Sequence, residues 1–198
     1  MKHTLIIAFT LILILSEKSV IAEITLGKEY ISPNGKYSAA LIQKSDGSSG
    51  LEIKDKKNTI ASFVVSNSIS LEWNKRSDVI FLVYPFADGT RLAIFILKNG
   101  KWSSDNEYFS EEGDSDKNEY GKSYLYKYIL EKNRVKAFFV FYIRKKSYTP
   151  SGDVDITDRT GVDILTISLA TGEVIDTSSR AIPDSEYRKL LDSAPWEK

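Results

Sequence analysis

The chain of 198 residues has no cysteine, and its one histidine, His3, stands near the N-terminus. Without these side chains there is no Ser-His-Asp triad, no Cys-His pair and no zinc site with the usual nitrogen or sulfur ligands. Carboxylate chemistry or a Ser-Lys dyad stays open, but Asp, Glu, Ser and Lys are abundant and form no recognisable pattern. The sequence therefore predicts a protein that is not an enzyme and holds no cofactor or metal.

Net charge is also absent, because 27 Lys and Arg balance 27 Asp and Glu. A neutral chain gives no electrostatic reason to expect nucleic acid as a partner. The apolar fraction of 42% and the charged fraction of 27% are near the globular average, which excludes wholesale disorder.

The longest apolar run, residues 5–15, is too short to cross a bilayer, which takes about 20 residues. Lys2 precedes it, and Val20-Ile21-Ala22 follows it with residues that a signal peptidase accepts. We predict a signal peptide over residues 1–22, with an uncleaved anchor as the alternative. Residues 23–198 would then form one all-β domain with a net charge of −1 and no stable membrane anchor. The short signal and missing disulfides favour a periplasmic or secreted protein.

Short β-branched and aromatic runs alternate with turn residues along the rest of the chain. Pairs such as Asn34-Gly35 and Asp46-Gly47 supply the positive φ of tight hairpin turns. This spacing is typical of antiparallel meanders and predicts an all-β fold. The expected strands are residues 36–44, 51–55, 60–65, 69–73, 79–84, 91–98, 124–130, 134–144, 162–169 and 173–177.

Two of these strands are expected at the centre of the sheets. Residues 79–84 and 134–144 carry apolar side chains on both faces, so both faces should be covered. Residues 183–186 have the composition of a helix start, and a short apolar stripe follows as far as Leu191. We expect one short C-terminal helix that caps the sheets.

Residues 31–41, with the turn Ser32-Pro33-Asn34-Gly35-Lys36, resemble the start of a TolB-type β-propeller repeat. In that family a Ser-Pro-Asp-Gly-Lys turn leads into an apolar strand, and the next strand ends in Asp, as residues 51–55 do here. A degenerate second copy, without Pro or Gly, begins at Leu71. At about 40 to 45 residues per blade, residues 23–198 make at most four blades. The resemblance implies an incomplete propeller-like stack of antiparallel sheets, and a β-sandwich is the alternative.

Residues 105–119 hold seven carboxylates and one lysine, a local net charge of −6 between two β halves. Such a run is usually a solvated loop, but it could also dock on a basic surface or plug a partner's cleft. The candidate partner-binding carboxylates are Glu111, Glu112, Asp114 and Asp116. The segment from Asp114 begins like a calcium loop, but Glu119 stands where glycine is needed, so we predict no metal site.

Tyr124, Tyr126 and Tyr128 alternate along one expected strand, so we expect them to line one face. If exposed, the row could stack on sugar rings or anchor a protein partner; otherwise it packs under a neighbouring strand. We count the three tyrosines among the candidate partner-binding residues.

These observations favour an exported, non-enzymatic protein-binding module. One candidate class is an immunity or inhibitor protein that neutralises a secreted toxin or hydrolase, an analogy of layout without a shared motif. The alternative is an envelope protein that binds glycan or peptidoglycan through the tyrosine row. An enzyme with paired carboxylates would need two acids about 5 to 9.5 Å apart across a cleft.

Overall fold

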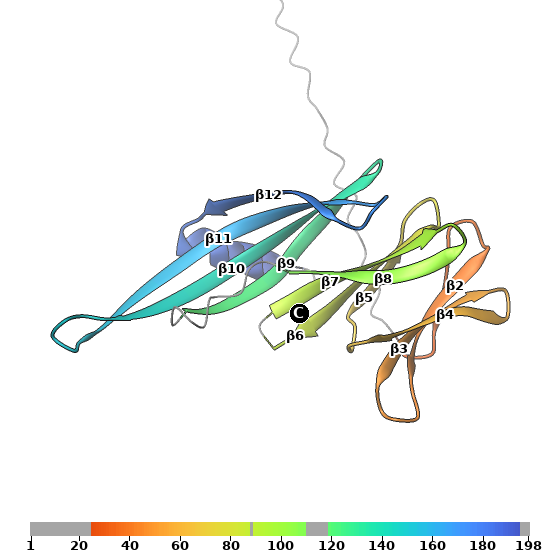
Figure 1. The fold of residues 1–198 in the computed structure, drawn as a ribbon, viewed down its shortest axis with the longest axis horizontal. Helices are drawn as coiled ribbons and strands as arrows, with labels where there is room; N and C mark the ends of the chain where they lie inside the picture. The colour runs from red at the N-terminus through yellow and green to blue at the C-terminus, as the bar shows by residue number, and fades with distance from the viewer. Residues whose placement is uncertain (1–24, 88, 110–118, 195–198) are drawn as a thin grey trace, which may run out of the picture.

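The computed structural model describes residues 25–87, 89–109 and 119–194, and its strands form three consecutive four-stranded antiparallel meanders (Figure 1). The first contains β1 (Glu29–Ile31), β2 (Tyr37–Gln43), β3 (Ser49–Asp55) and β4 (Asn58–Val65). The second contains β5 (Ser70–Trp73), β6 (Val79–Phe86), β7 (Gly89–Lys98) and β8 (Lys101–Tyr108). The third contains β9 (Glu119–Glu131), β10 (Arg134–Tyr148), β11 (Val154–Ser168) and β12 (Val174–Ala181), and α1 (Asp184–Ser193) follows it. The predicted all-β fold, an incomplete propeller-like stack with a C-terminal helix, is confirmed.

All ten expected strands are present, but β1 and β8 were not expected. Strand β8 has a polar sequence, and it forms because it pairs with β7 at the edge of the second meander. The expectation of a loop over residues 105–119 is therefore wrong at both ends, since residues 105–108 belong to β8 and Glu119 begins β9. Three meanders take the place of the two expected β halves.

The second meander buries both of its faces. On one face Ile80, Leu82 and Phe95 pack against Leu51 and other apolar residues of the first meander. On the other face the same strands pack against the third meander, through a cluster that includes Phe81, Ile94, Leu125, Phe139 and Ile167. The prediction that residues 79–84 lie at the centre is confirmed, because all six are buried.

Helix α1 covers the far face of the third meander. Tyr187, Leu190 and Leu191 pack against a cluster around Val140 and Val162, as the sequence predicted. The helix begins after Pro183, and the acidic residues in its first turn stabilise it through their interaction with the positive end of the helix dipole. No helix in the described part of the chain has the length and hydropathy needed to cross a bilayer.

The first two meanders share a turn of the same geometry, 42 residues apart. In the first, Ser32 N donates to Tyr37 O over 2.9 Å, and Tyr37 N donates to Ser32 Oγ over 2.9 Å. In the second, Asn74 N donates to Val79 O over 3.0 Å, and Val79 N donates to Asn74 Oδ1 over 3.1 Å. Gly35 and Ser77 occupy equivalent positions, with φ of 66° and 63°. The first two meanders thus share this turn, with Ser77 at the left-handed position that Gly35 holds in the first.

The second and third meanders meet where β7 begins. Gly89 and Ser123 form the parallel bridge that joins the two meanders into one eight-stranded sheet. Beside it, Leu125 N donates to the buried Oγ1 of Thr90 over 2.7 Å. Gly89 has φ of 141°, and a Cβ there would lie 1.5 Å from the carbonyl oxygen of Ser123. Only glycine permits this approach.

Gly89→Ala should lower the free energy of unfolding by about 3 kcal/mol or more. The Gly89–Ser123 bridge, the joint between the second and third meanders, must open to admit the methyl group. Gly100→Ala is the matched control: Gly100 also has positive φ, 77°, but nothing lies within 4 Å of its Cβ position. The control should lose only about 1 kcal/mol. Urea unfolding measures both, and equal losses would contradict the proposed role of the joint.

Candidate functional site

Strand β9 does not present its three tyrosines on one face. The pairing of β9 with β10 shifts register between Phe138 and Phe139, so that Phe138 faces Lys127 and Phe139 faces Leu125. This bulge places Tyr124 and Tyr126 under α1, while Tyr128 packs against the core between the second and third meanders. The expectation of one tyrosine face is wrong, because a bulge adds a residue and turns the following side chain to the other side.

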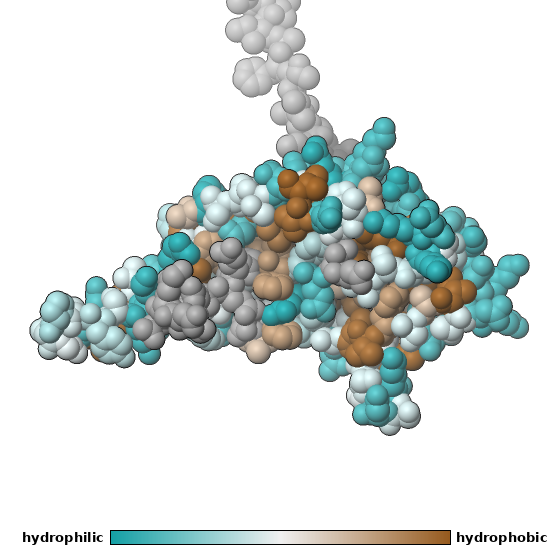
Figure 2. Space-filling view, in the orientation of Figure 1, coloured by the Kyte–Doolittle hydropathy of each residue, from teal (hydrophilic) through white to brown (hydrophobic). Residues whose placement is uncertain are grey.

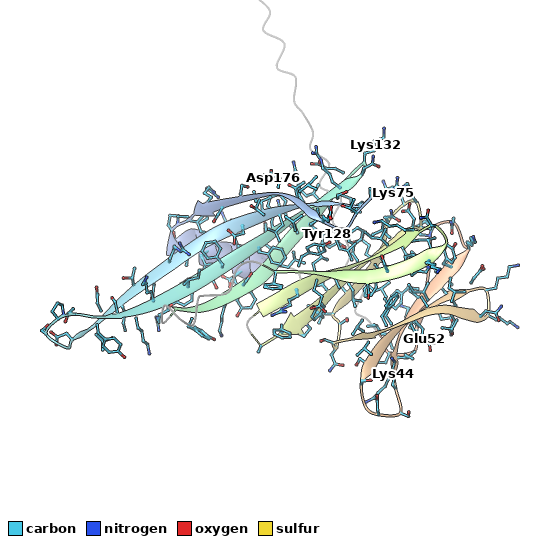
Figure 3. The ribbon with its side chains drawn as sticks, in the orientation of Figure 1. Lys44, Glu52, Lys75, Tyr128, Lys132 and Asp176 are labelled. Carbon is cyan, nitrogen blue, oxygen red and sulfur yellow. The ribbon has the colours of Figure 1, made fainter. Side chains whose placement is uncertain are left out.

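Tyr128 joins two meanders. Its ring stacks on Phe81 of β6 at 5.2 Å between centroids, and its hydroxyl donates to a carboxylate oxygen of Glu72 in β5. Burial raises the pKa of this hydroxyl above its usual value, so it stays protonated as a donor. Figure 3 shows Tyr128 where the third meander meets the second.

Glu111, Glu112, Asp114 and Asp116 lie outside the described residues, and their role stays a prediction. A cation lies near the end of the described range 89–109. The Arg91 guanidinium lies 3.6 Å from the ring centroid of Phe86 and 4.4 Å from that of Phe109, the last residue of that range.

The most prominent feature is a two-stranded arm formed by residues 146–156. Strand β9 pairs with β10 only as far as Lys145, and β12 pairs with β11 only from Gly161 onward. Beyond these points, within the described part of the chain, β10 and β11 pair only with each other, as far as Tyr148 and Val154. The arm extends past the rest of the third meander, at the left of Figure 1.

Three apolar side chains gather on one face of this arm. Tyr148 pairs with Val154, and Ile156 follows two residues later on the same face. Their exposed fractions are 69%, 52% and 53%. Among the described residues, no apolar cluster includes these three side chains, so this face is a candidate contact surface.

The arm is braced at its base and tip. At the base, Arg144 donates from Nε and Nη2 to the two carboxylate oxygens of Asp158, each over 2.9 Å. These bonds hold the pKa of Asp158 below its usual value, so the pair stays charged at neutral pH. At the tip, Asp153 N donates to Thr149 Oγ1 over 3.1 Å, and Ser151 Oγ donates to Asp153 Oδ2 over 2.7 Å. Hydrogen bonds therefore fix the arm at both ends.

Sequence reasoning missed the arm, because β10 was expected to end at residue 144 and β11 to begin at 162. A signal was present: Tyr148, Val154 and Ile156 alternate about the Thr149–Asp153 turn, which contains Pro150 and Gly152. In the described ranges, no group of three or more His, Cys, Asp or Glu residues is placed to hold a metal ion.

No protein-family model and no curated protein matches this sequence. Among solved structures, the chain is similar to the β-propeller domain of the Trilobed protease from Pyrococcus furiosus, which is described as having an open velcro topology. The two share 17% identity with a TM-score of 0.39, and the match covers 79% of this chain. The chain spans 42% of the length of that protein. The likeness is to a β-propeller in general and does not single out the TolB type.

Tyr128→Phe should lower the free energy of unfolding by about 2 kcal/mol, because it leaves the Glu72 carboxylate without its hydroxyl donor. Tyr126→Phe removes the same group from a tyrosine under α1 and should change it by less than about 0.5 kcal/mol. Chemical denaturation compares the two variants. A Tyr128→Phe variant as stable as the wild type would contradict the structural role of this hydroxyl.

Proposed function

We propose that this chain is an exported, non-enzymatic protein-binding module of the immunity or inhibitor class, which places its arm in the cleft of a secreted toxin or hydrolase. The observation that carries the proposal is the projecting arm, with Tyr148, Val154 and Ile156 exposed together on one face. Export rests on the leader pattern of residues 1–22, and the periplasm is the proposed location.

The physical properties of the arm support a role in protein recognition. Tyrosine is enriched among residues that dominate binding energy, and here it lies beside two β-branched aliphatic side chains. The braced tip and base reduce the conformational entropy lost on binding. Within the described ranges, neither edge of the ribbon beyond Lys145 pairs with a further strand, and a partner strand can be added at such an edge.

Glycan binding by the tyrosine row has weaker support, because Tyr124 and Tyr126 lie under α1 and Tyr128 faces the other way. We also propose that the repeat is of the TolB type. The turn at Ser32 leads into β2, and β3 ends at Asp55, as the family pattern requires.

The test is a pull-down from envelope extract with residues 23–198, followed by mass spectrometry. We expect one stoichiometric protein partner, and Ile156→Asp should weaken its binding at least about tenfold, because a carboxylate would be buried in an apolar contact. Ile156 is exposed, so the stability of the variant should stay within about 0.5 kcal/mol of wild type.

Ile175→Asp is the matched control, because Ile175 of β12 is 56% exposed and lies outside the arm. This variant should bind the partner as wild type does. Equal binding by both variants would contradict the role of the arm, and retention on peptidoglycan without any protein partner would contradict the protein-binding function itself.

A further inference from the structure

Six turns meet at one end of the stack. They are the turns between β1 and β2, β3 and β4, β5 and β6, β7 and β8, β9 and β10, and β11 and β12, and we call this set the basic rim. In an antiparallel meander every second turn lies at the same end, which places two of the six on each meander.

Hydrogen bonds make the rim continuous between meanders. Asn34 N donates to Ser77 Oγ over 3.0 Å, which joins the first meander to the second. Arg76 Nη1 donates to Asn133 Oδ1 over 3.5 Å, which joins the second to the third. Within the meanders, Leu97 N donates to Asp78 O and Leu169 N to Asn133 O, over 2.8 and 2.9 Å. These bonds connect five of the six turns, and the sixth, between β3 and β4, lies next to the first because Tyr37 pairs with Asp55.

This surface is strongly basic although the chain is neutral. The cations in the six turns or directly next to them are Lys36, Lys56, Lys57, Lys75, Arg76, Lys98, Lys101, Lys132 and Arg134. Four carboxylates occupy the same positions, namely Asp55, Asp78, Glu131 and Glu173, so nine cations against four carboxylates leave a net charge of +5. Figure 2 shows hydrophilic residues, interrupted by hydrophobic ones, along the upper and right-hand edges of the molecule, and Figure 3 places Lys75, Lys132 and Asp176 at the upper edge.

The kind of cation indicates the kind of partner. Seven of the nine are lysines, which are flexible point charges suited to a diffuse anionic surface. A site for one carboxylate or phosphate would favour the planar fork of arginine. The rim also consists of turn tips, so its charges suit an extended surface.

Two exposed isoleucines border the rim on the first meander. Ile31 ends β1 beside the first turn and is 61% exposed, and Ile60 lies near the start of β4 and is 46% exposed. Both point away from the core, because their neighbours Ala39 and Ala61 pack inward. Apolar side chains beside a cluster of lysines are typical of proteins that bind the surface of an anionic bilayer.

We propose that the basic rim docks this protein on an anionic lipid bilayer, with Ile31 and Ile60 entering the headgroup region. The arm lies at the far end of the third meander from the rim, so docking leaves it free to reach a partner (Figure 1). The proposal rests on the rim alone and does not require the proposed function of the arm.

The test measures binding of residues 23–198 to vesicles of phosphatidylglycerol and phosphatidylcholine by co-sedimentation. These residues retain every core contact, because the three apolar clusters lie within residues 25–194. We expect binding at 50 mM salt, at least tenfold weaker binding at 500 mM salt, and none to pure phosphatidylcholine. Absence of binding at low salt, or binding that salt does not weaken, would overturn the proposal.

Neutralising Lys57, Lys75 and Lys132 to glutamine, one on each meander, should weaken vesicle binding at least about thirtyfold, since each cation near an anionic bilayer contributes about a fivefold gain in affinity. The matched control neutralises Lys44, Lys146 and Lys189, which make the same change in net charge away from the rim. Equal losses in the two variants would overturn the proposal in favour of an effect of net charge.

Two further measurements separate the bilayer from an acidic protein partner, and the rim from the arm. Retention on polyglutamate beads without vesicle binding would overturn the bilayer in favour of an acidic protein. Ile156→Asp should bind vesicles as wild type does, and the rim variant should keep any protein partner of the arm. The failure of one proposal is thereby distinguished from the failure of the other.

Discussion

The second meander carries apolar side chains on both faces, and the need to cover both organises the rest of the fold. Ile80 and Leu82 require the first meander on one side, and Phe81 and Val83 require the third on the other. The third meander then has an apolar far face of its own, which α1 covers. Each layer of the stack thus covers an apolar face of its neighbour, beginning with the two apolar faces of β6. Burial of apolar area is the main favourable term in folding.

Apolar burial has no preferred direction, so it does not by itself set the angle between meanders. Specific short-range contacts do this. Gly89 lets β7 approach Ser123, and Thr90 accepts a hydrogen bond from Leu125 N. Tyr128 reaches Glu72, and the Tyr108 hydroxyl donates to the Gly172 carbonyl across the second and third meanders. Such contacts are few, and losing one leaves a buried polar group without its partner.

Both proposed contact surfaces are extensions of this rigid stack. The arm is an overlong hairpin whose middle strands continue after their neighbours have ended, and the rim is built from the turns at one end. The cations of the rim and the apolar side chains of the arm lie outside the three apolar clusters. In many proteins a rigid scaffold of sheets likewise positions the loops that bind a partner.

The sequence alone determined what depends on local period and local turn chemistry. The two-sided strand at residues 79–84, the helix after Pro183 and the turn from Ser32 to Gly35 were all predictable, because each is encoded by residues close together in the chain. The distribution of Tyr124, Tyr126 and Tyr128 over two faces was not, since the bulge arises from pairing with Phe138 and Phe139. The rim likewise gathers lysines from residues 36 to 132 that look scattered in the sequence. Only tertiary structure decides these features, because a strand's register and a turn's neighbours depend on which distant segments pack against them.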